Sequence, residues 1–296
     1  MLMAMLVLGL GYAGLAVAAA ARAAGWAVAG TRRAPRPGDE APPGLAVLPF
    51  AEAGAAIAAA THLVVTVPPG EGGDPVLEAH AGALARATAL RWVGYLSTTG
   101  VYGDRQGGWV DEATPPAPAQ ERSRRRLAAE EAWWAALAGR GVALDIFRTA
   151  GIYGPGRSAL DELRAGRARR VDRPGHLFSR IHRDDIAAAV LAAAGQGGWD
   201  VEAPRVLHLA DDEPAAGAAV TAEAARLLGV APPPLVPFEE AWAGMSPMAR
   251  SFWAENRRVD SRATRAALGL RWRHPDYRAG LRAILAEEPG TAFGQG

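Results

Sequence analysis

The chain has 296 residues, half of them hydrophobic, and a formal net charge of +1, so bulk charge gives nucleic-acid binding no support. Cysteine is absent, which excludes disulfides, a thiolate nucleophile and zinc–thiolate sites and fits a reducing, cytoplasmic location. All 32 basic residues are arginine, and the absence of lysine excludes Schiff-base chemistry and lysine-assisted hydride transfer.

The opening segment, as far as Ala21, carries no charge and is long enough to suggest a membrane span. No basic residue precedes it, which argues against a secretory signal. Three glycines interrupt it with the spacing G-x-G-x-x-G: Gly9, Gly11 and Gly14. They lie between an apolar strand over 3–8 and an alanine-rich helix, and a second strand follows over 26–30. This order predicts the first half of a dinucleotide-binding unit and no membrane partner.

The glycine turn predicts contacts to a dinucleotide. Gly9 permits the tight bend, Gly11 lets the backbone approach the diphosphate, and Gly14 lets the helix pack on the strand. The N-terminus of the helix offers backbone N–H groups and a partial positive charge to the phosphates. The cofactor contacts expected at this turn are Gly9, Gly11, Tyr12, Ala13 and Gly14.

The end of the second strand distinguishes NADP from NAD. NAD sites place a carboxylate there for the ribose 2′-OH. This sequence reads AGTRRAPRP, with no acid before Asp39. Arg32 and Arg33 would instead pair with a 2′-phosphate, and Thr31 would donate a hydrogen bond. We predict NADP as the cofactor and keep NAD as the less favoured alternative.

Strands and helices continue to alternate after this point. Further strands are predicted over 45–50 and 62–69, from Trp92, from Val142, and over 205–212. Helices are predicted over 51–60, over 75–88 with Asp74 as cap, and over 221–229. A longer helix is predicted after the Pro-rich segment 114–120 and runs through about Ala138. This alternation predicts a doubly wound parallel α/β sheet with helices on both faces.

Three motifs carry a family resemblance: STTGVYGD (97–104), RTAGIYGPGR (148–157) and FSRIHRDDIA (178–187). In this order they resemble the extended short-chain dehydrogenases/reductases, the NAD(P)-dependent epimerase/dehydratase superfamily. The glycine opening and the VPP after the fourth strand are similar to an atypical subgroup. The resemblance implies cofactor contacts from Val67, Pro68 and Ile152.

The same resemblance implies two domains. A Rossmann domain would comprise residues 1–151 plus about 176–210, and a small substrate-binding domain about 152–175 plus 211–296. Members of the family commonly form homodimers through the helices that follow the fourth and fifth strands. We therefore expect a homodimer, and Trp133 and Trp134 on the second of these helices would face either the core or the partner.

The family's chemistry uses a Ser/Thr after the fifth strand and a Tyr-x-x-x-Lys helix whose tyrosine carries the proton. Thr98 falls at the Ser/Thr position, and Ser97 is its neighbour. A glutamate should follow eight residues after the tyrosine. If it is Glu130, the tyrosine and lysine positions hold Arg122 and Arg126.

If the glutamate is Glu131, the tyrosine and lysine positions hold Ser123 and Leu127. Neither alignment therefore contains the Tyr–Lys pair. Arginine is not a general acid near neutral pH, because its pKa exceeds about 12. Arg126 would still hold a ribose hydroxyl of the cofactor.

Two tyrosines at the carboxyl ends of strands are candidates for the missing chemistry. Tyr153 joins Thr98 and Ser97 as a catalytic candidate, and Tyr102 and Arg157 are predicted to contact substrate. Loop packing is the alternative for both tyrosines. His182 has a suitable pKa for proton transfer, but RIHRDD is interpreted as a strand-to-helix junction capped by Asp184 or Asp185. The histidines show no paired spacing, and no metal site is predicted.

These observations predict an NADP-preferring oxidoreductase or epimerase/dehydratase-like enzyme. The resemblance implies that the arginine-rich segment 157–183 faces the substrate, which would then be a small molecule, phosphorylated or nucleotide-linked. The alternative for most of these arginines is a solvated surface. The alternative is a non-catalytic NADP-binding sensor or regulatory protein that has lost the proton shuttle.

Overall fold

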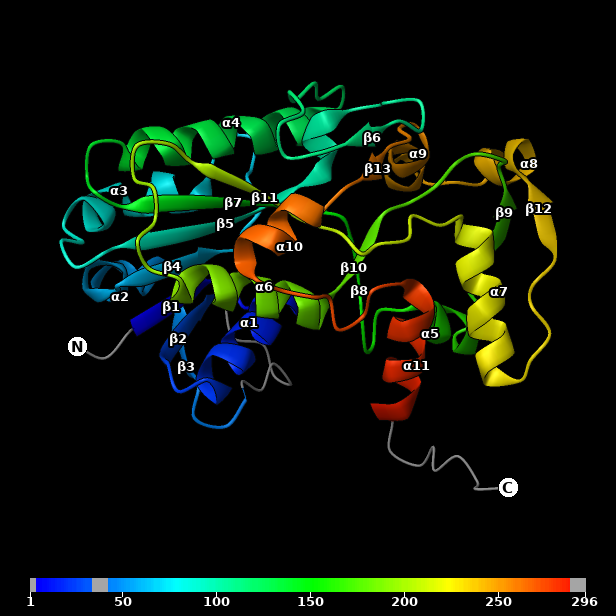
Figure 1. Ribbon diagram of the computed structural model, residues 1–296, viewed down its shortest axis with the longest axis horizontal. Helices are drawn as coiled ribbons and strands as arrows, with labels where there is room; N and C mark the ends of the chain where they lie inside the picture. Colours follow the sequence, from blue (N-terminus) through cyan, green and yellow to red (C-terminus); the bar gives the residue numbers. More distant parts are fainter. Residues whose placement is uncertain (1–3, 34–41, 288–296) are drawn as a thin grey trace.

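The computed structural model describes residues 4–33 and 42–287 and has a parallel β-sheet at its centre (Figure 1). Seven strands lie in the spatial order β11 (Arg205–Leu209), β7 (Ala143–Thr149), β5 (Trp92–Thr98), β4 (His62–Val65), β1 (Ala4–Leu8), β2 (Ala27–Arg32) and β3 (Ala46–Pro49). Every neighbouring pair is parallel. The strand order reverses at β1, and folds of this kind bind ligands in the crevice at such a point.

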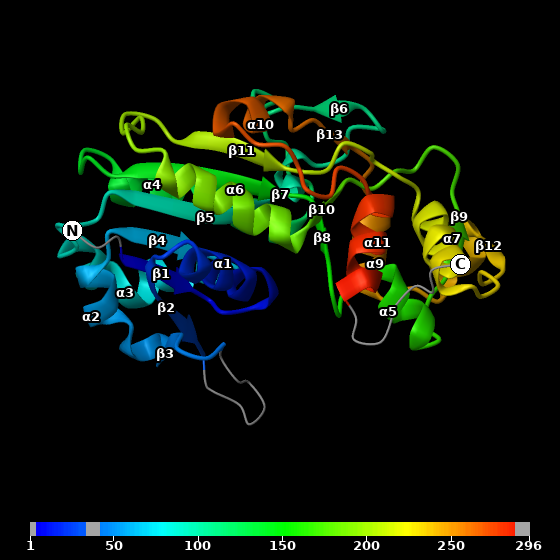
Figure 2. The same ribbon diagram turned by 60° about the horizontal axis from the view of Figure 1, so that its bottom comes forward.

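Helices cover both faces of the sheet, which is why its strands are continuously apolar (Figures 1 and 2). One face packs against α1 (Tyr12–Ala23), α6 (Arg183–Gly195) and α10 (Arg262–Leu268). The other packs against α2 (Gly54–Ala59), α3 (Pro75–Ala85) and α4 (Glu121–Leu137). Trp133 on α4 is fully buried in the second layer. The predicted doubly wound α/β fold is confirmed.

The opening apolar run forms β1, a glycine turn and α1, as predicted, although the predicted start at Met3 lies outside the described residues. None of the helices formed by residues 4–33 and 42–287 is long and apolar enough to span a bilayer. Asp74 caps α3 as predicted, since its carboxylate accepts the N–H groups of Val76 and Leu77.

The cap of α6 differs from the prediction. His182 is the N-cap, and its Nδ1 accepts the N–H of Asp184 at 3.3 Å. Asp185 is turned away, because its carboxylate accepts the backbone N–H groups of Arg273 and His274 at 2.7 and 3.0 Å. The motif is a strand-to-helix junction, as predicted, and it also binds a segment near the end of the chain.

A smaller helical unit lies at the carboxyl ends of the strands (Figures 1 and 2). Its core is formed by α5 (Ala159–Arg164), α7 (Gly217–Leu228) and α11 (Tyr277–Glu287). Two short helices, α8 (Phe238–Ala243) and α9 (Pro247–Trp253), complete it. Short parallel pairs join β8 (Gly151–Tyr153) to β10 (Arg180–His182), β9 (Arg170–Asp172) to β12 (Leu235–Pro237), and β6 (Trp109–Val110) to β13 (Arg258–Val259).

These short pairs escaped the sequence analysis, because two or three residues carry no measurable periodicity. The predicted domain boundaries stay a prediction, and the packing of one helix differs from them. Helix α10 belongs to the segment 211–296, yet it packs against α6 and β11 of the sheet. The smaller unit therefore excludes part of the segment that was expected to form it.

Candidate functional site

The glycine turn has the geometry that binding of a diphosphate requires. Gly9 has φ +104°, a left-handed conformation that favours glycine. A Cβ at Gly14 would lie 2.1 Å from the carbonyl oxygen of Gly9, so only glycine allows α1 to approach the turn. A Cβ at Gly11, the N-cap of α1, would meet nothing within 4 Å. The N-terminus of α1 therefore opens onto space that suits an anion.

This turn borders a cavity of about 1170 Å³, here called the glycine-loop cavity. Most of the predicted cofactor contacts line it: Gly9, Gly11, Tyr12, Thr31, Arg32, Arg33, Val67 and Pro68. Phe50 and Thr66 line it as well, although nothing in the sequence analysis singled them out. Ala13 and Gly14 are buried in α1 beneath the turn and do not line the cavity.

The end of β2 presents the arginines expected at a 2′-phosphate. Arg32 is half-buried and Arg33 is exposed, and both line the glycine-loop cavity. Thr31 differs from the expectation because it is fully buried, and its Oγ1 accepts the N–H of Gly9 at 3.1 Å. The Thr31 side chain thus supports the glycine turn, and its contact with a phosphate stays a prediction.

A second cavity of about 610 Å³, the Thr98 cavity, begins where Pro68 and Pro69 line both spaces. Thr98 ends β5, and its Oγ1 accepts the N–H of Gly100 at 3.1 Å. Arginines dominate the charged lining among the described residues, with a single carboxylate: Arg122, Arg125, Arg126, Arg180, Arg257 and Glu255. The Thr98 cavity is therefore suited to an anionic ligand.

No family model matches the sequence. Among solved structures, a conserved protein of unknown function from Silicibacter pomeroyi is 40% identical, with a TM-score of 0.85 over 96% of this chain and 98% of that protein. A Methylobacillus flagellatus protein assigned as an NAD-dependent epimerase/dehydratase is 29% identical, with a TM-score of 0.72 over 97% and 98%. The chain is thus similar to proteins of this superfamily, the extended short-chain dehydrogenases/reductases, and shares their fold.

Curated relatives of this chain include a 3-diazoavenalumate denitrifying reductase from a Streptomyces species. It is 31% identical over 147 residues, which is 46% of this chain and 45% of that protein. The chain spans less than two thirds of the length of the curated relatives that it matches.

The two alignments considered for α4 differ in which of their positions reach the Thr98 cavity. Arg122, Ser123 and Arg126 line the Thr98 cavity, whereas Leu127 packs into a hydrophobic cluster. The alignment on Glu130 is thus the one that brings both of its positions to the cavity. The Arg122 guanidinium carbon lies 4.3 Å from the ring centroid of Phe252 on α9. Burial lowers the pKa of Arg122, and the charge of Glu255 opposes this shift.

Ser97 and Tyr102 take part in a buried network instead of the cavity lining. The Ser97 hydroxyl donates to Glu130, which forms a bidentate ion pair with Arg148 at 2.7 and 3.2 Å. Arg148 Nη1 donates to the Tyr102 hydroxyl at 2.9 Å, and that hydroxyl also contacts His208 Nε2. Tyr102 is fully buried. We therefore assign Ser97 and Tyr102 to the scaffold, contrary to the expected catalytic and substrate roles.

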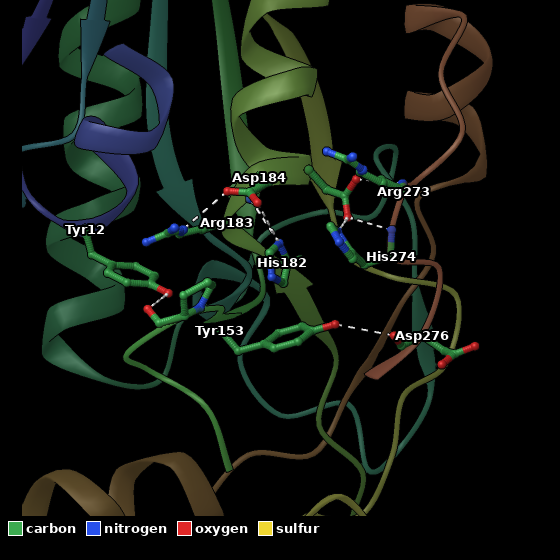
Figure 3. Close-up of polar contacts among 10 residues, drawn as sticks. Tyr12, Tyr153, His182, Arg183, Asp184, Arg273, His274 and Asp276 are labelled. Atoms are coloured by element: carbon green, nitrogen blue, oxygen red, sulfur yellow. Dashed lines mark hydrogen bonds and ion pairs between the residues drawn. The ribbon is translucent and has the colours of Figure 1, made fainter. Parts of the chain in front are cut away.

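Tyr153 lines the Thr98 cavity, and its hydroxyl points toward Asp276 (Figure 3). The hydroxyl donates to the carbonyl oxygen of Asp276 at 3.4 Å, and a Cβ at Gly280 would lie 2.0 Å from it. Burial raises the pKa of Tyr153, and the charges of Asp211 and Asp185 raise it further. This position and this pKa argue against the expected role of Tyr153 in proton transfer.

Ile152 lines the Thr98 cavity, as a cofactor contact should, whereas Arg157 lines a separate space of about 380 Å³. This small-domain cavity lies against α5 and α7 and shares Tyr153 and Arg180 with the Thr98 cavity. Arg180 escaped the sequence analysis because nothing in its own motif shows that it lies between two cavities.

His182, Asp185 and His274 form a buried cluster whose ligand-type atoms lie within 4.8 Å of one another (Figure 3). The two imidazole rings are 3.9 Å apart, and Asp185 accepts from His274 Nδ1 at 2.9 Å. Burial lowers the pKa of His182 to about 4, and the charge of His274 adds to this shift. We interpret the cluster as a structural junction between α6 and residues 273–274, which no local sequence pattern could reveal.

Proposed function

We propose that the chain is an NADP(H)-dependent reductase of a small anionic substrate. One observation carries this proposal: a cavity lined by arginines and Thr98 adjoins the glycine-loop cavity at Pro68 and Pro69. A dinucleotide laid across these two prolines would reach from the glycine turn to Thr98. The reductase among the curated relatives is consistent with this class of reaction.

The residues present fit NADP. Arg32 and Arg33 would pair with its 2′-phosphate, and the N-terminus of α1 would face its diphosphate. Ile152 and Arg126 would lie beside the nicotinamide ribose. When bound, the cofactor supplies a hydride to the substrate carbon.

Thr98 and Arg122 would act on the substrate. The Thr98 hydroxyl already accepts the Gly100 N–H, so its own proton is available to a substrate oxygen. Arg122 would offset the negative charge that develops on that oxygen during reduction. Water would then protonate the oxygen, because the guanidinium keeps its own proton near neutral pH.

Arginines at the tyrosine and lysine positions favour a reductase over an epimerase. Epimerisation removes a proton from a substrate hydroxyl and later returns one, which requires a group that titrates near neutral pH. Arg122 and Arg126 do not titrate there. Reduction needs one proton after hydride transfer, and solvent can supply it.

The turnover test follows NADPH absorbance across a panel of small carbonyl compounds that carry a carboxylate or a phosphate. We expect Thr98→Ala to lower kcat/KM on the order of 100-fold, the loss typical of one donor to a developing oxyanion. Arg226→Met, an exposed residue paired with Glu223 on α7, serves as the control. Turnover that Thr98→Ala leaves intact would contradict the assignment of Thr98.

The cofactor test compares the affinities of NADPH and NADH. We expect the parent protein to prefer NADPH, and Arg32→Asp to lower NADPH affinity about tenfold or more, as a lost charge-assisted contact does. Equal affinities in the parent protein would refute the NADP preference.

The alternative is a non-catalytic NADP-binding sensor, and one contact favours it. Arg126 Nη1 donates to the Leu96 carbonyl oxygen at 2.8 Å and to the Tyr95 hydroxyl at 3.2 Å, which holds this charge against β5. NADPH binding without turnover of any compound in the panel would support the sensor.

A further inference from the structure

Tyr12 connects two loops that are far apart in the sequence (Figure 3). Its ring lines the glycine-loop cavity, and its hydroxyl donates to the carbonyl oxygen of Pro155 at 3.0 Å. Pro155 lies in the turn that follows β8, 143 residues away. The glycine turn is therefore joined directly to the loop that separates the cofactor side from the small-domain cavity.

Gly154 is the position that allows Tyr12 this close an approach. Its φ is +157°, and a Cβ there would lie 2.6 Å from the Tyr12 hydroxyl oxygen and 3.1 Å from Arg183 Cγ. A side chain at this position would displace the Tyr12 hydroxyl and crowd Arg183, so glycine at residue 154 leaves room for the contact between Tyr12 and Pro155.

Two guanidinium groups flank the Tyr12 ring. The Cζ atom of Arg183 lies 5.2 Å from the ring centroid, and that of Arg157 lies 5.5 Å away. Cation–π contacts at such distances hold a guanidinium without neutralising its charge. Arg183 Nε also contacts the Asp184 carboxylate at 3.3 Å. Two positive groups and one partly exposed carboxylate thus lie beside the Tyr12 ring.

Two helix N-termini add to the positive potential here. Helix α1 begins at Tyr12 itself, with no acidic residue in its first turn, and α6 begins at Arg183. The first turn of α6 also carries two carboxylates, Asp184 beside Arg183 and Asp185, which accepts the backbone N–H groups of Arg273 and His274, so α1 contributes more to this potential than α6. Anions are stabilised at such N-termini, most strongly where arginines lie beside them.

We infer that Tyr12, Arg157 and Arg183 form a clamp for the diphosphate of the dinucleotide, with the Tyr12–Pro155 hydrogen bond closing it. This inference rests on the proposed function, since it requires a dinucleotide on the glycine turn. It reassigns Arg157 from the substrate to the cofactor. Arg157 and Arg183 neutralise the bridging phosphates, and the hydrogen bond retards release of the bound cofactor.

The test titrates the full-length protein and its variants with NADPH at fixed ionic strength. Arg157→Met and Arg183→Met should each weaken binding about tenfold, because each removes a charged hydrogen-bond donor and keeps most of the side-chain volume. Arg226→Met on α7 is the matched control and should bind as the parent does. A second probe, adenosine 2′-monophosphate, keeps the 2′-phosphate and carries no phosphate at the 5′ position, and its affinity should fall less than threefold.

Tyr12→Phe keeps the ring and removes only the hydroxyl. We expect NADPH to dissociate several times faster from this variant in a stopped-flow displacement experiment, with little change in unfolding temperature. An unchanged dissociation rate would overturn the closing role of the hydrogen bond.

The remaining outcomes separate the two proposals. A parent protein that binds no NADPH overturns both the proposed function and the clamp. Parent binding that neither arginine variant weakens overturns the clamp alone. The clamp is also overturned if the arginine variants lose affinity for both probes equally, which indicates general electrostatic attraction. It is likewise overturned if only the KM of the substrate rises, which indicates that Arg157 contacts the substrate.

Discussion

The glycine-loop cavity and the Thr98 cavity adjoin each other but are constructed differently. The first is bordered mainly by two consecutive stretches, the turn after β1 and the loop after β4, with the end of β2 beside them. The second draws on β5, α4, β8, β10 and the segment 251–259. The lining of the glycine-loop cavity is thus mostly local in sequence, whereas the lining of the Thr98 cavity depends on tertiary packing.

The scaffold behind the Thr98 cavity gives the largest expected effect. Glu130→Gln breaks the buried ion pair with Arg148, whose side chains are 3% and 6% exposed. Leaving that charge unpaired should reduce the free energy of unfolding by about 3–5 kcal/mol, measured by denaturant titration. Glu162→Gln breaks the exposed pair with Arg167 and should leave the free energy of unfolding nearly unchanged. Equal losses would show that the Glu130 network is not the scaffold of this cavity.

The glycine-loop cavity can be tested with a matched pair of glycines. Gly14→Ala places a Cβ 2.1 Å from the Gly9 carbonyl oxygen, so it should cost about 1–3 kcal/mol of stability and about 100-fold in NADPH affinity. Gly11→Ala meets no atom within 4 Å and should unfold like the parent while binding NADPH more weakly. Thermal unfolding alongside cofactor titration distinguishes the two. A Gly11→Ala protein with parental affinity would place the diphosphate elsewhere.

A smaller effect concerns Asp211, which lies beyond β11 near Arg180. Burial raises its pKa to about 8, against the opposing charge of Arg180. The folded state therefore binds this proton more tightly than the unfolded state, and stability falls as the pH rises from about 4 through about 8. Asp211→Asn should be more stable than the parent at pH 8, with the difference shrinking as the pH falls toward about 4. A difference that grows toward low pH would reverse the assigned direction.

The sequence predicts the parts of this molecule that depend on contiguous residues. The strands alternate with helices at regular intervals, so the sheet could be predicted. The glycine spacing identifies the turn, so the glycine-loop cavity could be predicted as well. The cap at Asp74 was equally accessible, because the aspartate and Pro75 are adjacent.

The other cavity could be predicted only in part. The family resemblance located Thr98 and the two arginines of α4. It did not show that the neighbouring side chains of Ser97 and Thr98 point in different directions. Ser97 turns to Glu130 in the interior, while Thr98 faces the cavity. No local pattern indicates that choice, because it depends on where α4 packs. Glu255 and Arg257 were missed for the same reason, as they reach the cavity from a distant segment.

The contacts of Asp185 have a practical consequence for protein engineering. Asp185 lies two positions after Arg183 and accepts the backbone of residues 273 and 274, so the tail of the chain fixes the start of α6. A change that displaces the segment near His274 should shift the Arg183 guanidinium, which we assign to the diphosphate clamp. Tail variants should therefore be checked for nucleotide affinity as well as for folding.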